Sequence, residues 1–140
     1  MDAKGRLIIP ARFRQVFKDN GDGGLMVSTK LDGGLVAYPF DEWDKTENRL
    51  LSLAEPDEFI RRFIRFFIGS AAECPLDKQD RILIPPPLRQ EAGLNKDIVL
   101  VGVLDHFEIW ARDRWEQEKA DLQGAMKERE DYRNKIAKLF

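Results

Sequence analysis

The stretch Asp2-Ala3-Lys4-Gly5-Arg6-Leu7-Ile8-Ile9-Pro10 occurs twice in this chain, returning 75 residues later as Asp77-Lys78-Gln79-Asp80-Arg81-Ile82-Leu83-Ile84-Pro85. Aspartate, arginine, isoleucine and proline recur at matching places without a gap. The similarity continues downstream, because Leu31-Asp32 aligns with Leu104-Asp105, and the segment of Trp43 aligns with that of Trp115 after a one-residue deletion. Two copies of one pattern in a short chain indicate two copies of one structural unit.

Each copy predicts the same order of elements. A β-rich run ends at a proline, a short helix follows, and two further apolar runs around an Asp-containing turn predict a hairpin. The expected strands are 6–9, 25–29 and 35–38 in the first copy and 81–84, 98–103 and 107–110 in the second. The expected helices are 11–18, with the apolar stripe Phe13, Val16 and Phe17, and one beginning at Pro86; residues 19–24 are expected to form a loop.

The segments between and after the copies are predicted to be largely helical. Asp41 can cap a helix that turns Trp43, Leu50 and Leu51 inward. A helix beginning near Pro56 carries an apolar stripe that we expect to pack in the core, with subunit contact as the alternative: Phe59, Ile60, Phe63, Ile64 and Phe67. Residues 66–76 should end in a strand, and the chain after Trp115 should be helical to its end.

Together these elements predict an α+β fold, in which two tandem small β-units with short helices form one pseudo-symmetric module followed by a C-terminal helix. The expected boundaries are 1–43 for the first unit, 44–65 for connecting helices, 66–115 for the second unit and 116–140 for the C-terminal helix. The first unit has no counterpart of the strand before Asp77, so a symmetric repeat would need roughly ten further residues before Met1. We therefore expect the leading strand of the first unit to be missing from this sequence.

The composition is that of a globular protein. Of 140 residues, 43% are hydrophobic and 34% charged, and no apolar run is long enough to cross a bilayer. The single cysteine, Cys74, excludes an internal disulfide, which fits a reducing compartment. The formal net charge is −2, yet among the first 18 residues the only acidic residue is Asp2. The basic residues of this segment are Lys4, Arg6, Arg12, Arg14 and Lys18. This segment is the expected place of contact with an anionic partner.

Little in the sequence supports catalysis. The one histidine, His106, and the one cysteine, Cys74, are distant in the chain, and a nucleophile pair or a metal site needs more ligands than they offer. The glycine-rich run at 21–24 lacks the lysine and Ser/Thr of a phosphate loop. We therefore predict no enzyme activity, no metal, no cofactor and no small-molecule substrate, with Cys74 as a small buried residue.

The two Asp-x-x-x-Arg turns are the candidate binding elements. In a structural interpretation, Asp2 and Asp77 bond local amides and each arginine pairs with a carboxylate. In a functional interpretation, Lys4 and Arg6 project from a strand edge towards DNA phosphates or guanine edges. We favour the structural role for the aspartates and leave both interpretations open for Arg6 and Arg81.

The two turns differ in charge. Asp80 stands in the second copy where the first has Gly5, so the second motif carries less positive charge. We therefore expect the first copy to dominate any contact with an anion.

The repeated motifs closely resemble those of the MraZ family, which is built from two tandem AbrB/SpoVT-like domains. The resemblance spans nearly the whole chain up to Trp115 and is carried by four motifs: Asp2-Ala3-Lys4-Gly5-Arg6-Leu7-x-Ile9-Pro10, Ala72-Glu73-Cys74-x-Leu76-Asp77-Lys78-Gln79-x-Arg81-Ile82-Leu83-Ile84-Pro85, Val99-Leu100-Val101-Gly102 and Phe107-Glu108-Ile109-Trp110. Asp80 departs from the family, where glycine is usual. The family also has about nine residues before the first motif.

The resemblance implies a sequence-specific DNA-binding regulator of the bacterial division and cell-wall gene cluster. It implies a cytoplasmic, nucleoid-associated, ring-shaped homo-oligomer, with an octamer among the sizes it allows, on tandem repeats of double-stranded DNA near its own promoter. Lys4 and Arg6 match the family's DNA-contacting motif, and Lys78 and Arg81 match its second copy. With the basic residues Arg12 and Arg14, these form the expected DNA-binding set.

Two other functions remain as alternatives. An oligomeric protein-interaction scaffold would use the basic segment to meet acidic partners and would show no preference among DNA sequences. An enzyme would need a closed pocket with convergent titratable groups, for which His106 and Cys74 are the last candidates.

Overall fold

The repeat folds as an alternation of short strands and helices in a computed structural model that describes residues 1–20 and 23–140, with side chains placed for 1–15 and 23–140. In chain order the elements are β1 (Arg6–Ile8), α1 (Ala11–Asn20), β2 (Gly24–Thr29), β3 (Leu35–Pro39), α2 (Phe40–Leu51), α3 (Glu58–Gly69), β4 (Ala72–Pro75), β5 (Arg81–Leu83), α4 (Pro86–Ala92), β6 (Ile98–Val103), β7 (His106–Ala111), α5 (Arg112–Glu128) and α6 (Glu130–Ala137). The predicted α+β class is confirmed. The expected bounds of the loop at 19–24 were wrong at both ends, because α1 continues to Asn20 and β2 begins at Gly24. Residues 21–22 lie outside the described residues, as do the side chains of Val16 and Phe17.

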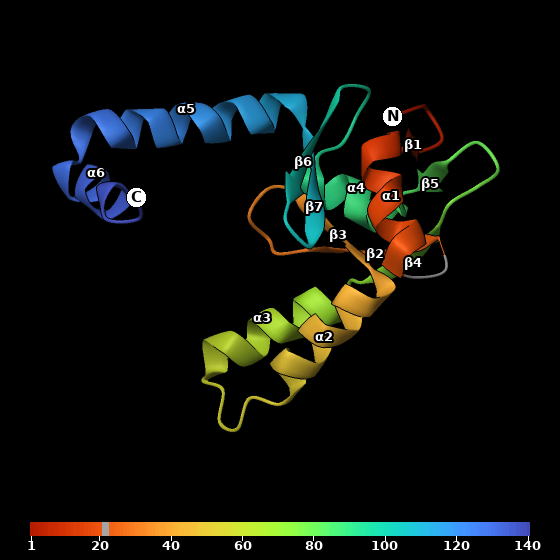
Figure 1. The fold of residues 1–140 in the computed structure, drawn as a ribbon, viewed down its shortest axis with the longest axis horizontal. Coiled ribbons are helices and arrows are strands. Elements are labelled where there is room, and N and C mark those ends of the chain that lie inside the picture. The colour runs from red at the N-terminus through yellow and green to blue at the C-terminus, as the bar shows by residue number, and fades with distance from the viewer. Residues whose placement is uncertain (21–22) are drawn as a thin grey trace.

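Two antiparallel sheets join the two copies. The larger has the strand order β4-β2-β3-β7-β6, so β2 and β3 of the first copy lie between strands of the second (Figure 1). The smaller is a two-stranded ribbon in which β1 pairs with β5, with Leu7 opposite Ile82 at its centre. Because strands pair across the copies, β2, β3 and β7 each have a neighbour on both sides within one module, while β4 and β6 form the edges of the larger sheet.

Reciprocal hydrogen bonds reveal the internal two-fold symmetry. The amide of Ile9 donates to the carbonyl of Asp80, and the amide of Ile84 donates to the carbonyl of Gly5, each at 2.9 Å. These pairs exchange under the 75-residue shift of the sequence repeat. The pseudo-two-fold axis therefore passes through the centre of the β1–β5 ribbon.

One core serves both copies. On each ribbon strand, alternate residues point inward: Leu7 and Ile9 on one side, Ile82 and Ile84 on the other, all buried. They pack in one cluster with residues of the larger sheet, among them Leu25, Val27, Leu35, Cys74, Phe107 and Ile109. Burial of this shared apolar surface holds the two copies together as one module.

The two edges of the larger sheet differ. The predicted strand before Asp77 is present as β4, which pairs with β2. Among the described residues, β6 pairs only with β7, and its side chains are half-buried or exposed where those of β2 are mostly buried. Within the described residues, β6 therefore forms one edge of the larger sheet and β4 the other.

Helices α2 and α3 form a hairpin that extends from the body (Figure 1). Its small core brings Trp43, Phe63 and Phe67 together, with ring centroids 5.1 Å apart for Trp43–Phe67 and 5.5 Å apart for Phe63–Phe67. Asp57 caps α3 by accepting from the amide of Ile60 at 2.7 Å.

Three expectations for this hairpin were wrong: the cap at Asp41, the inward Leu51 and the buried Phe59. The first turn of α2 contains Asp41 after Pro39 as the N-cap, and Leu51 is exposed rather than turned inward. Of the predicted core stripe on α3, Phe67 is buried, whereas Phe59 is 74% exposed. The reason is that the base of the hairpin meets the sheet, while only α2 is available to cover the far end of α3.

The C-terminal region is helical, as predicted, but it bends once. The backbone of Arg129 leaves helical geometry, with φ −112° and ψ 99°, and separates α5 from α6. The guanidinium of Arg133 braces the bend by donating to the carbonyls of Met126 and Lys127. Helix α5 extends away from the body and α6 folds back at its end (Figure 1), and neither helix has a buried residue.

Candidate nucleic-acid interface

The first Asp–Arg turn is closed by a single carboxylate. Oδ1 of Asp2 accepts from the amides of Lys4 at 3.0 Å and Arg6 at 2.8 Å, while Oδ2 accepts from Nε of Arg6 at 2.6 Å. The backbone adds bonds from the Gly5 amide to the Asp2 carbonyl and from the Asp2 amide to the Arg6 carbonyl. The aspartate thereby fixes both the loop and the direction of the arginine.

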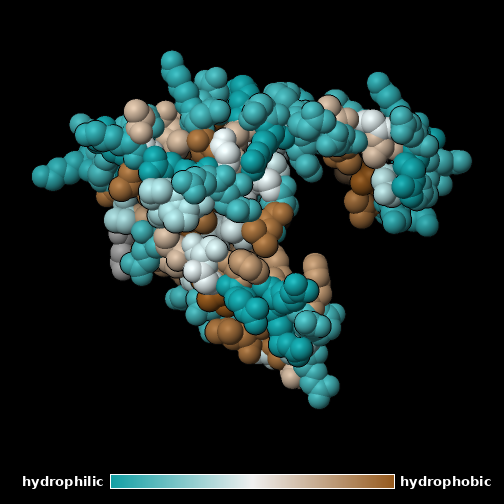
Figure 2. All heavy atoms as spheres, turned by 180° about the vertical axis from the view of Figure 1, so that it is seen from behind, coloured by the Kyte–Doolittle hydropathy of each residue, from teal (hydrophilic) through white to brown (hydrophobic). Residues whose placement is uncertain are grey.

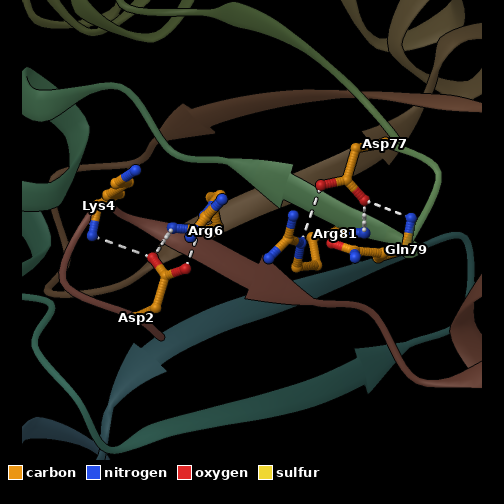
Figure 3. Close-up of polar contacts among 6 residues, drawn as sticks. All are labelled: Asp2, Lys4, Arg6, Asp77, Gln79 and Arg81. Atoms are coloured by element: carbon orange, nitrogen blue, oxygen red, sulfur yellow. Dashed lines mark hydrogen bonds and ion pairs between the residues drawn. The ribbon is translucent and has the colours of Figure 1, made fainter.

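The second turn repeats this geometry bond for bond. Oδ1 of Asp77 accepts from the amides of Gln79 at 2.8 Å and Arg81 at 2.9 Å, and Oδ2 accepts from Nε of Arg81 at 2.8 Å (Figure 3). Asp80 stands where the first turn has Gly5. The same constellation therefore occurs at both ends of the ribbon.

Each turn requires one residue with positive φ. Gly5 has φ +87° and Asp80 has φ +61°. Glycine adopts this region freely, and aspartate is among the few other residues that tolerate it. The replacement of Gly5 by Asp80 in the repeat therefore keeps the turn while adding a charge.

Hydrogen bonding keeps both turn aspartates ionised. The amide of Arg6 is the largest cause that holds the pKa of Asp2 below its ordinary value, and the amide of Arg81 does the same for the pKa of Asp77. The arginine side chains add to this effect.

The outer face of the ribbon carries two arginines and two aliphatic residues. Since the inner positions are buried, Arg6 and Ile8 on β1 and Arg81 and Leu83 on β5 point outward. Ile8 is 64% exposed and Leu83 55% exposed. The register sets Arg6 opposite Leu83 and Ile8 opposite Arg81, so the arginines lie on a diagonal. The outer face of the ribbon therefore presents guanidinium groups and aliphatic side chains side by side.

The lysines differ between the turns. Lys4 and Lys78 are both exposed, but the repeat places Gln79 at the position of Lys4 and Lys78 at that of Ala3. The two ammonium groups therefore occupy different places on otherwise matching loops.

An arginine on helix α1 of the first copy lies beside the turn of the second copy. Arg14 of α1 donates through Nη1 to the carbonyl of Ile9 at 2.9 Å and lies 3.4 Å from Oδ2 of Asp80, at the second turn. Arg12 is exposed, with its guanidinium 4.8 Å from the ring centroid of Phe13. The basic segment of the sequence is thus divided in space rather than gathered at one turn.

Arg89 is a residue of this surface that we did not predict. Its guanidinium lies directly over Gly5, where an added Cβ would come within 2.6 Å of it. The signal was present in the repeat, because Arg89 is the counterpart of Arg14 under the same 75-residue shift. Each turn is thus backed by an arginine from the other copy.

Cys74 and His106, the two candidate catalytic residues, lie far apart in the structure. Cys74 lies on β4 and His106 on β7, with β2 and β3 between them, so they are separated by about 14 Å across the sheet. Burial raises the pKa of Cys74 to about 11. The ring of His106 stacks on Tyr38 with centroids 4.6 Å apart, and its Nδ1 lies 2.8 Å from Oδ1 of Asp105. Within the described residues, no group of three His, Cys, Asp or Glu side chains could hold a metal, and no helix could span a membrane.

Comparisons with known proteins agree on one family. A family model described as "MraZ protein, putative antitoxin-like" matches residues 1–65 and 67–135, one match for each copy. A protein of Desulforapulum autotrophicum is 52% identical over 140 residues, covering 99% of this chain and 92% of its own length. One of Desulfosudis oleivorans is 50% identical over 139 residues with the same coverage, and one of Pelotomaculum thermopropionicum is 48% identical over 129 residues, covering 91% and 86%. All three are named Transcriptional regulator MraZ.

Proposed function

The chain belongs to the MraZ family, and from this membership and the β1–β5 ribbon we propose that it is a transcription regulator that binds double-stranded DNA in a sequence-specific manner. The single observation that carries the proposal is the pair of partly exposed arginines, Arg6 and Arg81, each fixed by an aspartate on one outward ribbon face. Relatives that cover nearly the whole chain carry the name of a transcriptional regulator.

The ribbon suits the major groove in shape. That groove is about 12 Å wide and admits a two-stranded β-ribbon. Arg6 and Arg81 use Nε for their aspartates, which leaves both terminal nitrogens of each guanidinium without a partner among the described residues. Two such nitrogens can bond O6 and N7 of guanine, while Ile8 and Leu83 can contact thymine methyl groups.

The surrounding cations supply non-specific affinity. Lys4 and Lys78 are exposed on the turns, and Arg12 and Arg14 lie on α1 close to the ribbon. In our proposal Lys4, Lys78 and Arg12 contact phosphates, which position a protein on the duplex without reading its sequence. Arg14, which the sequence also placed in the DNA-binding set, is paired with Asp80 in the structure. The proposed contacts of the wild type are thus Arg6 and Arg81 for bases, with Lys4, Lys78 and Arg12 for the backbone.

We further propose that the protein acts as a ring-shaped homo-oligomer on tandem promoter repeats of the division and cell-wall gene cluster. A few phosphate contacts per subunit give weak binding at physiological salt, whereas several linked subunits on repeated sites gain effective concentration. Exposed apolar side chains support an assembly. They gather on the α2–α3 lobe and at the end of the α5–α6 arm (Figure 2), and include Leu51, Leu53, Phe59, Phe66, Leu122, Ile136, Leu139 and Phe140.

The proposal is tested by binding to duplex DNA from upstream of the protein's own gene, compared with a shuffled duplex of equal length, at several salt concentrations. We expect tighter binding to the native duplex and an affinity that falls steeply with salt. Equal binding to both duplexes would favour the alternative, an oligomeric protein-interaction scaffold. That alternative draws its support from the same exposed phenylalanines on α3.

A further inference from the structure

The two turns differ at one position, where the first has Gly5 and the second has Asp80. In the structure the carboxylate of Asp80 is paired with an arginine of the other copy. Nη1 of Arg14 lies 3.4 Å from Oδ2 of Asp80, across the pseudo-two-fold axis. The equivalent pair at the first turn is Arg89 and Gly5, which have no carboxylate between them. Arg14, beside the second turn, is therefore paired with a carboxylate, whereas Arg89, beside the first turn, has no carboxylate partner among the described residues.

The difference persists at the level of single atoms. Arg14 makes two contacts, with the Ile9 carbonyl and with Asp80, and its side chain is 24% exposed against 41% for Asp80. Nε of Arg89 is buried and bonds no other described group. Arg14 is thus paired with a carboxylate at the second turn, whereas the guanidinium of Arg89 lies behind Gly5 with no carboxylate partner among the described residues.

We propose that Asp80 withholds Arg14 from DNA and thereby makes the first turn the dominant phosphate-contacting turn of each subunit. This inference rests on the DNA-binding function proposed above and names the residue that sets how the contact is distributed. A phosphate that approaches the second turn meets a carboxylate already bound to the nearest arginine. A phosphate at the first turn meets Lys4, with the guanidinium of Arg89 behind Gly5 and no carboxylate at the position of Asp80.

The backbone allows a clean test at this position. Asp80 has φ +61°, a region that asparagine enters as readily as aspartate. Asp80→Asn therefore removes the charge and keeps the turn. We expect it to bind the native duplex about three- to tenfold more tightly and to steepen the salt dependence by about one unit of log–log slope, as one more phosphate is contacted.

The role of Arg14 is isolated by a four-protein cycle: wild type, Asp80→Asn, Arg14→Ala and the double variant. Arg14→Ala alone should change affinity little, because Asp80 already occupies this arginine. In the Asp80→Asn background it should remove the gain and return the slope to the wild-type value. A gain that persists in the double variant would overturn the proposal, since it would come from lost repulsion alone.

A reciprocal variant tests the first turn. Gly5→Asp introduces the carboxylate of the second turn, at the cost of backbone strain at φ +87°, and it meets the flexible end of Arg89, which can move to pair with it. Weaker binding with a shallower salt slope is expected. Gly5→Asn is the matched control, since it carries the same strain without the charge. If wild type and Asp80→Asn bind equally, with Arg6 still required, the inference fails while the proposed function stands; if wild type binds no DNA, the proposed function fails. Circular dichroism melts of each variant verify folding.

Discussion

Asp2 bonds both the backbone and the side chain of Arg6. One carboxylate oxygen accepts from the amide of Arg6 at 2.8 Å, and the other accepts from its Nε at 2.6 Å. The same double contact joins Asp77 and Arg81. A guanidinium fixed in this way loses less side-chain entropy when it meets a ligand. The turn is thus a structural motif and a means of presenting arginine at once.

Stability should depend on the ionisation of these two aspartates. Their pKa values are lowered in the folded protein, so the unfolded chain binds protons more tightly, and the stabilisation is present above the ordinary value of 3.8. It is lost as pH falls through the lowered pKa values. We expect the melting temperature of the wild type to fall below about pH 4.

The matched variant is Asp77→Asn, which keeps the shape of the side chain and cannot titrate. The gap in melting temperature between wild type and Asp77→Asn should be large at pH 7 and should close as the pH approaches 2. A gap that is independent of pH would show that the charge of Asp77 contributes nothing to the turn.

Cys74 should be inert in the folded protein. Burial in the shared core raises the pKa of its thiol to about 11, so little thiolate forms at pH 8, and its side chain is inaccessible to reagents. We expect labelling with a thiol-reactive chromogenic disulfide to be at least about tenfold slower in native buffer than in guanidinium chloride. Rapid labelling of native protein would mean that β4 detaches from β2.

The core residue of the helical hairpin should matter for stability. Phe67 is buried against Trp43 and Phe63, so Phe67→Ala should lower the free energy of unfolding by about 3–5 kcal/mol. Phe140→Ala, at the fully exposed end of the chain, should change it by less than about 0.5 kcal/mol. Urea unfolding followed by tryptophan fluorescence measures both, and equal effects would contradict the description of this core.

Assembly should depend on the exposed side of α3. Phe59 and Phe66 are both exposed there, and a soluble protein rarely leaves two such residues uncovered on one helix. The double variant Phe59→Ser/Phe66→Ser should lower the mass measured by light scattering, while Lys127→Ala on α5 should leave it unchanged. A wild type that is monomeric at working concentration would remove the basis of the ring.

Local and repeated features of the fold were predictable from the sequence. The aligned Asp-x-x-x-Arg motifs, the strands of both copies and the start of a helix near Pro56 each depend on neighbouring residues in the chain, so spacing alone identifies them.

What escaped prediction depends on long-range geometry. The pair Arg14–Asp80 joins residues that meet only because β1 pairs with β5 across the axis. The exposure of Phe59 depends on how far α2 extends over α3, which an apolar stripe cannot reveal. The bend at Arg129 lies in a run of polar residues with no proline, so no local signal marks it.

The most direct test of the central claim is the salt dependence of DNA binding by wild type and Arg6→Ala, with Lys127→Ala as a control for lost positive charge. If Arg6 reads guanine from the ribbon, Arg6→Ala should cost about 1–3 kcal/mol on the native duplex and should weaken the preference over the shuffled duplex. Lys127→Ala should match wild type on both. The same affinity and preference for Arg6→Ala as for wild type would contradict the account, because the ribbon would then not be the surface that reads DNA.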